Sequence, residues 1–132
     1  RVRVLALDYG SARCGTALSD RSGTLATPGE VVERPSTKRG MQRIAAIADE
    51  SGAELVLVGL PLSLSGTDTD QTRESREFAE QISRRVRVPV ELYDERLTTA
   101  MAQRTPGSTG EDSRAAAHLL ESWLDAQSGG IR

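Results

Sequence analysis

Apolar residues recur with two different spacings along the chain, and the spacing predicts which segments form strands and which form helices. Residues 2–8 and 13–19 are short apolar runs joined by a tight turn, a pattern typical of buried strands. Residues 24–33 predict a third strand, which a Pro-Gly pair at 28–29 interrupts. Because proline cannot donate a ladder hydrogen bond, this strand belongs at the edge of the sheet. The three strands together predict an antiparallel meander.

The rest of the chain alternates helical and strand patterns. Its longer segments carry apolar residues at the spacing of an amphipathic helix, and short apolar runs separate them, as in strand–helix–strand units. Two further stretches predict a flexible loop at 105–110 and a fraying tail at 128–130. The predicted elements are a helix from Ser36 or Thr37 to Ser51, a strand at 55–58, a helix at 70–85, a strand at 90–93, a brief helix at 97–103 and a last helix at 111–126.

This element order predicts an α/β fold with one mixed sheet. Right-handed crossovers place the two later strands beside the first, which gives the strand order 3-2-1-4-5 with helices flanking the sheet. The sequence has no internal repeat and no linker, so we expect a single domain over residues 1–132. Ligands of such sheets collect at the carboxyl ends of the parallel strands, where the strand order reverses. Asp8 lies at that point.

Composition excludes some functions and permits others. The chain has only four aromatic residues, which argues against a base-stacking platform for single strands. Its net charge of −2 argues against tight non-specific binding of nucleic acid, although 16 of the 17 basic residues are arginines, which suit bidentate phosphate contacts. The single cysteine, Cys14, lies in an apolar run and predicts a core residue in a reducing cytoplasm. No apolar stretch is long enough for a membrane helix.

Three segments bring carboxylates to one rim of the predicted sheet. Asp8 ends the first strand, and Asp94 and Glu95 end the last, which runs parallel to it. Asp112 precedes Ala116 of the last helix by four residues and therefore shares its apolar stripe, facing the sheet. Converging carboxylates are hard oxygen ligands that suit Mg²⁺ or Mn²⁺. Two such ions support hydrolysis of phosphodiester bonds.

Each acidic position also has a purely structural interpretation. Asp8 can order the turn that follows it, and the segment that begins at Asp94 can be a solvated loop. Thr109 and Asp112 have the spacing of a capping box, so Asp112 can serve only to start a helix. Neighbours on a strand face opposite ways, and periodicity does not decide which of Asp94 and Glu95 points into the site.

Several polar residues are candidate phosphate contacts. Arg13 follows Asp8 by five residues across a tight turn, and Arg96 comes directly after the acidic pair. Ser65 and Thr67 belong to a polar loop that offers hydroxyls and backbone N–H groups to a phosphate, but the loop lacks phosphate-loop spacing. His118 flanks an apolar stripe and is better explained as a packed or surface residue than as a ligand.

Four motifs resemble those of one bacterial family. They are LALDYGSARCGTALSD at 5–20, VGLPLSLSGTD at 58–68, DERLTT at 94–99 and DSRAAAHLLESWL at 112–124. The chain thereby resembles the YqgF/RuvX family, whose members are described as Holliday-junction resolvases and as nucleases of pre-ribosomal RNA. The resemblance implies a ribonuclease-H-like fold, in agreement with the predicted strand order.

The resemblance also implies an activity. It places the metal-binding acids at Asp8, the Asp94–Glu95 pair and Asp112, with Asp8, Glu95 and Asp112 catalytic. We therefore expect a cytoplasmic two-metal endonuclease that processes the 5′ end of small-subunit ribosomal RNA precursors. Cleavage of branched DNA as a junction resolvase is one alternative, and a non-cleaving nucleic-acid-binding factor of ribosome biogenesis or transcription is another. The expected state is a monomer or a weak homodimer, with no membrane partner.

Overall fold

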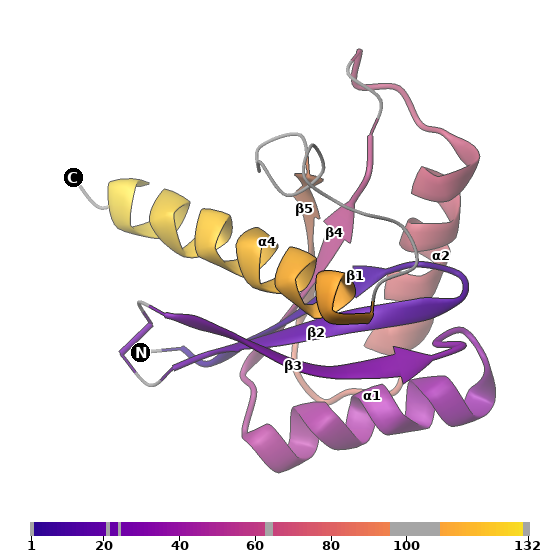
Figure 1. Cartoon of the computed structure of the whole chain (residues 1–132), viewed down its shortest axis with the longest axis horizontal. Helices are drawn as coiled ribbons and strands as arrows, with labels where there is room; N and C mark the ends of the chain where they lie inside the picture. The colour runs from indigo at the N-terminus through magenta and orange to yellow at the C-terminus, as the bar shows by residue number, and fades with distance from the viewer. Residues whose placement is uncertain (1, 21, 24, 63–64, 96–108, 131–132) are drawn as a thin grey trace.

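A mixed five-stranded sheet is the framework of the protein (Figure 1). The computed structural model describes residues 2–20, 22–23, 25–62, 65–95 and 109–130, with backbone alone for 109–112 and 128–130. The strand order is β3-β2-β1-β4-β5, and β1 runs antiparallel to β2 but parallel to β4. The order and directions predicted from the sequence are confirmed. The strands are β1 (Val4–Tyr9), β2 (Arg13–Ser19), β3 (Ala26–Glu33), β4 (Leu55–Leu60) and β5 (Val90–Asp94).

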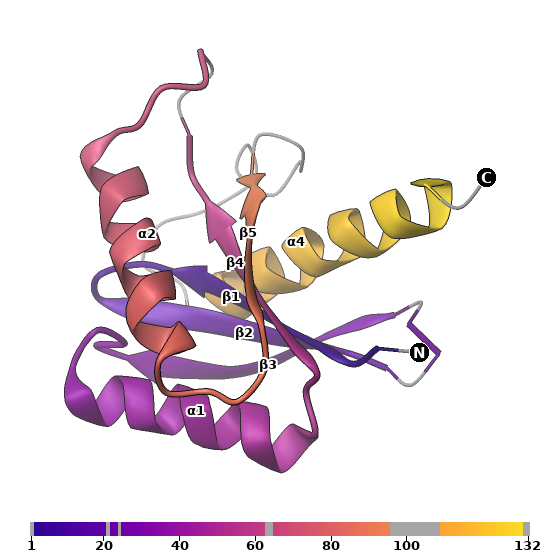
Figure 2. The same ribbon diagram turned by 180° about the vertical axis from the view of Figure 1, so that it is seen from behind.

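Helices cover both faces of the sheet. Helices α1 (Lys38–Ser51) and α2 (Asp70–Ser83) lie on one face, and α4 (Thr109–Gly130) crosses the other, as the two opposite views show (Figures 1 and 2). The sheet is therefore the middle of three layers. Among the described residues, no helix is both long and apolar enough to cross a membrane.

Local sequence signals fix where α1 begins and ends. The Thr37 side chain accepts a hydrogen bond from the Gly40 backbone N–H at 3.1 Å, as an N-cap does. Gly52 ends the helix in the left-handed conformation with φ of 70°. A similar device starts α2, where Thr69 and Thr72 form a capping box. The observed start and end of α1 agree with the sequence prediction for this helix.

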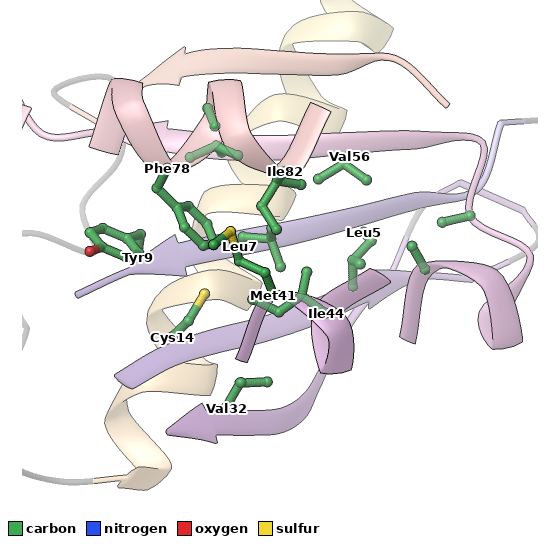
Figure 3. Close-up of a cluster of buried hydrophobic side chains, with 14 residues drawn as sticks. Leu5, Leu7, Tyr9, Cys14, Val32, Met41, Ile44, Val56, Phe78 and Ile82 are labelled. Carbon is green, nitrogen blue, oxygen red and sulfur yellow. The ribbon is translucent and has the colours of Figure 1, made fainter. Parts of the chain in front are cut away.

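Alternation along β1 divides the core into two clusters. Leu5, Leu7 and Tyr9 point to the α1/α2 face, where Figure 3 shows them among Ile44 and Phe78. The Tyr9 and Phe78 rings stack with centroids 4.4 Å apart. Cys14 is fully buried in the same cluster, as predicted.

The intervening residues of β1 point the other way. Val4 and Ala6 pack beneath α4, together with Leu57 and Leu120. Asp8 continues this series, so the alternation turns its side chain to the α4 face.

The structure corrects several predicted boundaries. β1 runs through Tyr9, so Asp8 lies inside the strand, and the Pro-Gly pair does not interrupt β3, because a register shift between Gly15 and Ala17 of β2 accommodates it. α2 ends at Ser83, two residues early, while β4 continues to Leu60 and β5 to Asp94. The predicted helix at 97–103 lies outside the described residues.

α4 is longer at both ends than its sequence pattern suggests. It begins at Thr109 and reaches Gly130, so residues 109–110 are helical and not loop, and residues 128–130 are helical and not a frayed tail. The helix is attached to the sheet by side-chain hydrogen bonds. Near its middle, the Trp123 indole donates a hydrogen bond to Glu91 at 3.1 Å, and the Tyr93 and Ser122 hydroxyls lie 3.1 Å apart. Such tertiary contacts override local propensity.

Candidate active site

Asp8 is a buried carboxylate in the central strand. Asp8 is 4% exposed and pairs with Gly15 of β2 in the antiparallel ladder. Burial of a carboxylate is expensive unless polar partners or a cation surround it. Asp8 does interact with other groups in this structure. A buried acid at the middle of the sheet is the first component of the candidate site.

Glu95 comes to the same place from the end of β5. It is 3% exposed, and its carboxylate lies directly over Gly59 of β4: a Cβ atom on Gly59 would be only 2.6 Å from Glu95 Oε2. Leu7 pairs with Val58, so the next residues along these parallel strands, Asp8 and Gly59, are neighbours. Two buried carboxylates from separate strands thus approach one point on the α4 face.

The strand register distinguishes Asp94 from Glu95. Tyr93 pairs with Gly59 and packs in the cluster beneath α4, whereas Asp94 pairs with Leu60. Side chains alternate along a strand, so Asp94 faces the α1/α2 side. Glu95 follows the end of β5, and its carboxylate lies over Gly59 on the face of Asp8. Of the two acids that the sequence left open, Glu95 is the one adjacent to Asp8.

The start of α4 is fixed over the edge of the sheet. The buried Ser113 hydroxyl donates to the Gly29 carbonyl of β3 at 2.8 Å. Asp112 precedes Ser113 in the first turn of α4, but its side chain lies outside the described set. The capping-box interpretation requires Thr109 to be the residue just before the helix. Thr109 instead lies within the helix. Within the described part of the chain, no group of three or more acidic, histidine or cysteine residues is arranged to hold a metal ion.

The other candidates occupy different positions. Arg13 begins β2 two residues before Gly15, which places it on the face of Asp8, and its Nε lies 3.9 Å from Glu33 Oε2. Ser65 and Thr67 are exposed, and their hydroxyl oxygens are 3.2 Å apart. Arg96 lies outside the described residues.

His118 is not part of this arrangement. It is a surface residue on α4, and its Nδ1 lies 3.4 Å from Glu121 of the same helix. The structure therefore agrees with the interpretation of His118 as a surface residue.

Comparison with known proteins identifies the family. A sequence profile described as RuvX, Holliday junction resolvase, matches residues 2–126. The chain belongs to the RuvX family. A Mycolicibacterium paratuberculosis relative named "Putative pre-16S rRNA nuclease" is 39% identical over 142 residues, covering all of this chain and 85% of the relative. A Mycobacterium tuberculosis H37Rv protein of the same name is 42% identical over 135 residues, covering 95% of this chain and 79% of the relative.

Solved structures confirm the ribonuclease-H-like fold. Thermus thermophilus RuvC, in complex with a Holliday junction substrate, superposes with a TM-score of 0.63 at 16% identity, over 97% of each chain. The fowlpox virus Holliday junction resolvase has a TM-score of 0.53 at 11% identity, over 95% of this chain and 99% of that one. The predicted family and the predicted nuclease class, an enzyme that hydrolyses phosphodiester bonds, are thus confirmed.

Proposed function

We propose that this RuvX family member is a metal-dependent endonuclease that processes the 5′ end of the small-subunit ribosomal RNA precursor. The observation that carries the proposal is the approach of two buried carboxylates, Asp8 and Glu95, across the bare backbone of Gly59. The RNA substrate is inferred from the relatives, which are named for pre-16S rRNA. Strongly buried acids that converge from separate strands are typical of functional sites.

The residues present fit a divalent cation. Both described acids offer carboxylate oxygens, the donors that Mg²⁺ and Mn²⁺ prefer. Gly59 contributes no side chain, so its position beside Asp8 leaves room for the Glu95 carboxylate. We propose Asp8 and Glu95 as ligands and Asp112 as the third, because α4 begins above the same face of the sheet. Asp94, which faces the other way, is not in this set.

The chain's own residues position the substrate and the ligands. When bound, the divalent ions supply an activated water and stabilise charge on the leaving oxygen. Asp8 is held between paired strands on both sides, so its carboxylate is preorganised. Arg13, on the same face, would contact a phosphate oxygen of the substrate. Arg96, Ser65 and Thr67 stay candidate phosphate contacts.

A cleavage assay with the Asp8→Asn variant tests this function. Loss of even a partner of a metal ligand costs about 10–100-fold in activity or metal affinity, so we expect Asp8→Asn to lower the cleavage rate by about a hundredfold or more. The melting temperature should not fall, because the substitution keeps the shape of the buried side chain. Glu80→Gln is the matched control, since Glu80 is an exposed acid paired with Arg84 on α2. Its activity should be unchanged.

The choice of substrates distinguishes the candidate activities. With Mn²⁺ present, a precursor ribosomal RNA 5′-end fragment is compared with a four-way DNA junction. The junction is included because the family profile is described as a Holliday junction resolvase. Cutting of the RNA supports the proposal, and cutting of the junction alone favours the resolvase. Binding without cutting, with metal binding confirmed by calorimetry, contradicts both and favours a non-cleaving factor.

A further inference from the structure

Three exposed cations gather where β3 leads into α1. Arg34 directly follows β3, and Lys38 and Arg39 are the first two residues of α1. We name these three residues the α1 cation cluster. None of them forms an ion pair with a residue that the structure describes.

Other arginines on the helices behave differently. Arg43, one turn further along α1, contacts Glu30 at 2.7 Å, and this hydrogen bond holds the pKa of Glu30 below its usual value. On α2, Arg76 pairs with Asp68 at 3.1 Å, and Arg84, which directly follows α2, pairs with Glu80 at 2.8 Å. These arginines are neutralised locally, whereas the three cations of the cluster have no such partner among the described residues.

The cluster also opposes the stability of its own helix. The first turn of α1 contains no acidic residue, although acids are favoured there and cations are disfavoured by the helix dipole. Exposed cations at this end therefore contribute nothing to the stability of α1 and slightly oppose it. The arrangement is explained if an anion from outside the chain neutralises them.

The cluster lies at the same end of the sheet as the candidate active site. The Arg34 backbone N–H donates to the Ala12 carbonyl, in the β1–β2 turn, at 2.9 Å. Asp8 pairs with Gly15, and Gly15 pairs with Val31 of β3, so two strand spacings, or roughly 10 Å, separate β1 from β3. The cluster lies on the α1 side of the sheet and Asp8 on the α4 side, so a nucleic-acid strand would pass around this end of the sheet to reach both. Beside the cluster is a hollow of about 460 Å³, lined by Glu33, Arg34, Thr37, Arg39 and Gly40.

We propose that the α1 cation cluster binds backbone phosphates of the nucleic-acid substrate on one side of the bond that is cut. This inference rests on the proposed nuclease function and adds the path of the substrate. The guanidinium groups of Arg34 and Arg39 offer flat, bidentate contacts to phosphate oxygens. In a chain with net charge −2, such a local cluster also orients an incoming polyanion.

The double variant Lys38→Gln/Arg39→Gln tests the proposal, with Arg76→Gln/Arg84→Gln as the matched control. Both double variants remove two exposed positive charges, but the control arginines are already paired with acidic residues. The probe is a labelled RNA hairpin with a 5′ single-stranded extension, bound at several salt concentrations to proteins that also carry Asp8→Asn. We expect the cluster variant to bind about tenfold or more weakly, with a salt slope lower by about 2. The control should retain the slope.

A thermal melt separates binding from a structural role. Removal of cations from the positive end of α1 should leave the melting temperature unchanged or raise it, whereas a structural contribution would lower it. An unchanged salt slope, or an equal loss in the control pair, overturns the proposal.

The result is independent of cleavage. If the slope falls but the parent protein cuts nothing, the cluster is upheld and the nuclease proposal fails. If the parent protein cuts RNA and the slope is unchanged, the cluster alone is overturned. Absence of any binding to the hairpin at low salt overturns both.

Discussion

Gly59 leaves space for the Glu95 side chain because it has no side chain of its own. Its Cα faces the Glu95 carboxylate, and a Cβ atom there would lie 2.6 Å from Oε2 and 2.9 Å from Cδ. Both distances are shorter than van der Waals contact allows, so Glu95 would have to move. Because Glu95 is long and rotates about several bonds, it can move without displacing the backbone. The glycine therefore determines the position of a carboxylate and contributes little to stability.

We expect Gly59→Ala to impair catalysis without unfolding the protein. A small displacement of a catalytic group can cost about a hundredfold in rate, so kcat should fall markedly while the melting temperature changes little. Cleavage kinetics and a thermal melt of the same preparation measure the two effects.

Gly52→Ala should show the opposite behaviour and serves as the control. Gly52 ends α1 at φ of 70° with no atom within 4 Å of its missing Cβ, so alanine is strained there but displaces nothing. We expect a loss of about 1 kcal/mol in the free energy of unfolding, with kcat retained. Full activity in Gly59→Ala would show that the position of Glu95 is not critical.

The sequence predicts the candidate acids but not their arrangement. Asp8 was predictable because it ends an apolar run at the point where the strand order reverses. The choice between Asp94 and Glu95 was not, because alternation fixes only that neighbours differ. It becomes decidable once Tyr93 is known to pair with Gly59 and to pack beneath α4. Register is set by long-range pairing, which the sequence pattern does not contain.

Helix α4 is the element on which the proposed third ligand depends. Its first turn carries Asp112, and the adjacent Ser113 is hydrogen-bonded to the Gly29 carbonyl at 2.8 Å. Ser122, more than two turns further along, lies 3.1 Å from the Tyr93 hydroxyl. Both serines therefore attach α4 to the sheet, but only Ser113 does so next to the proposed ligand.

Alanine substitutions at the two serines distinguish anchoring of the site from anchoring of the helix. Each removes a hydrogen bond worth about 1 kcal/mol, so both variants should be destabilised to a similar extent in denaturant titrations. Only Ser113→Ala should also weaken Mn²⁺ binding, by about 10–100-fold, because it frees the turn that holds Asp112. Calorimetric titration with Mn²⁺ measures this. Equal metal affinity in the two variants would exclude a positioning role for Ser113.

Elements with local signals were easier to predict than elements without them. α1 was placed correctly because Thr37 and Gly52 are caps that act within a few residues. β2 was predicted with both ends right from its apolar run and the turns around it. The start of α4 was not, because Ser113 is fixed by Gly29, which is 84 residues away in the sequence.

Each face of the sheet carries one hydrophobic cluster, and the strands contribute residues to both. Leu5 and Leu7 contribute to the cluster beneath α1 and α2, while Val4 and Ala6 contribute to the cluster beneath α4. Because neighbouring residues of β1 serve both clusters, neither can lose its packing without disturbing the strand. The site at Asp8 depends on both clusters, since it continues the same strand. We therefore propose that the chain folds as one cooperative unit, which is the single domain expected from its sequence.

Core substitutions on opposite faces of the sheet test this cooperativity. Ile82 and Leu120 are both fully buried, one in each cluster. Ile82→Val should lower the free energy of unfolding by about 1 kcal/mol and Leu120→Ala by about 2–5 kcal/mol, because each leaves a cavity. The two residues belong to different clusters on opposite faces of the sheet, so the double variant should show the sum to within about 0.5 kcal/mol. Each variant should unfold in one transition, with fluorescence and circular dichroism coinciding. Two separate transitions, with Leu120→Ala shifting only one, would mean that α4 folds apart from the sheet and that the proposed third ligand is docked independently of the other two.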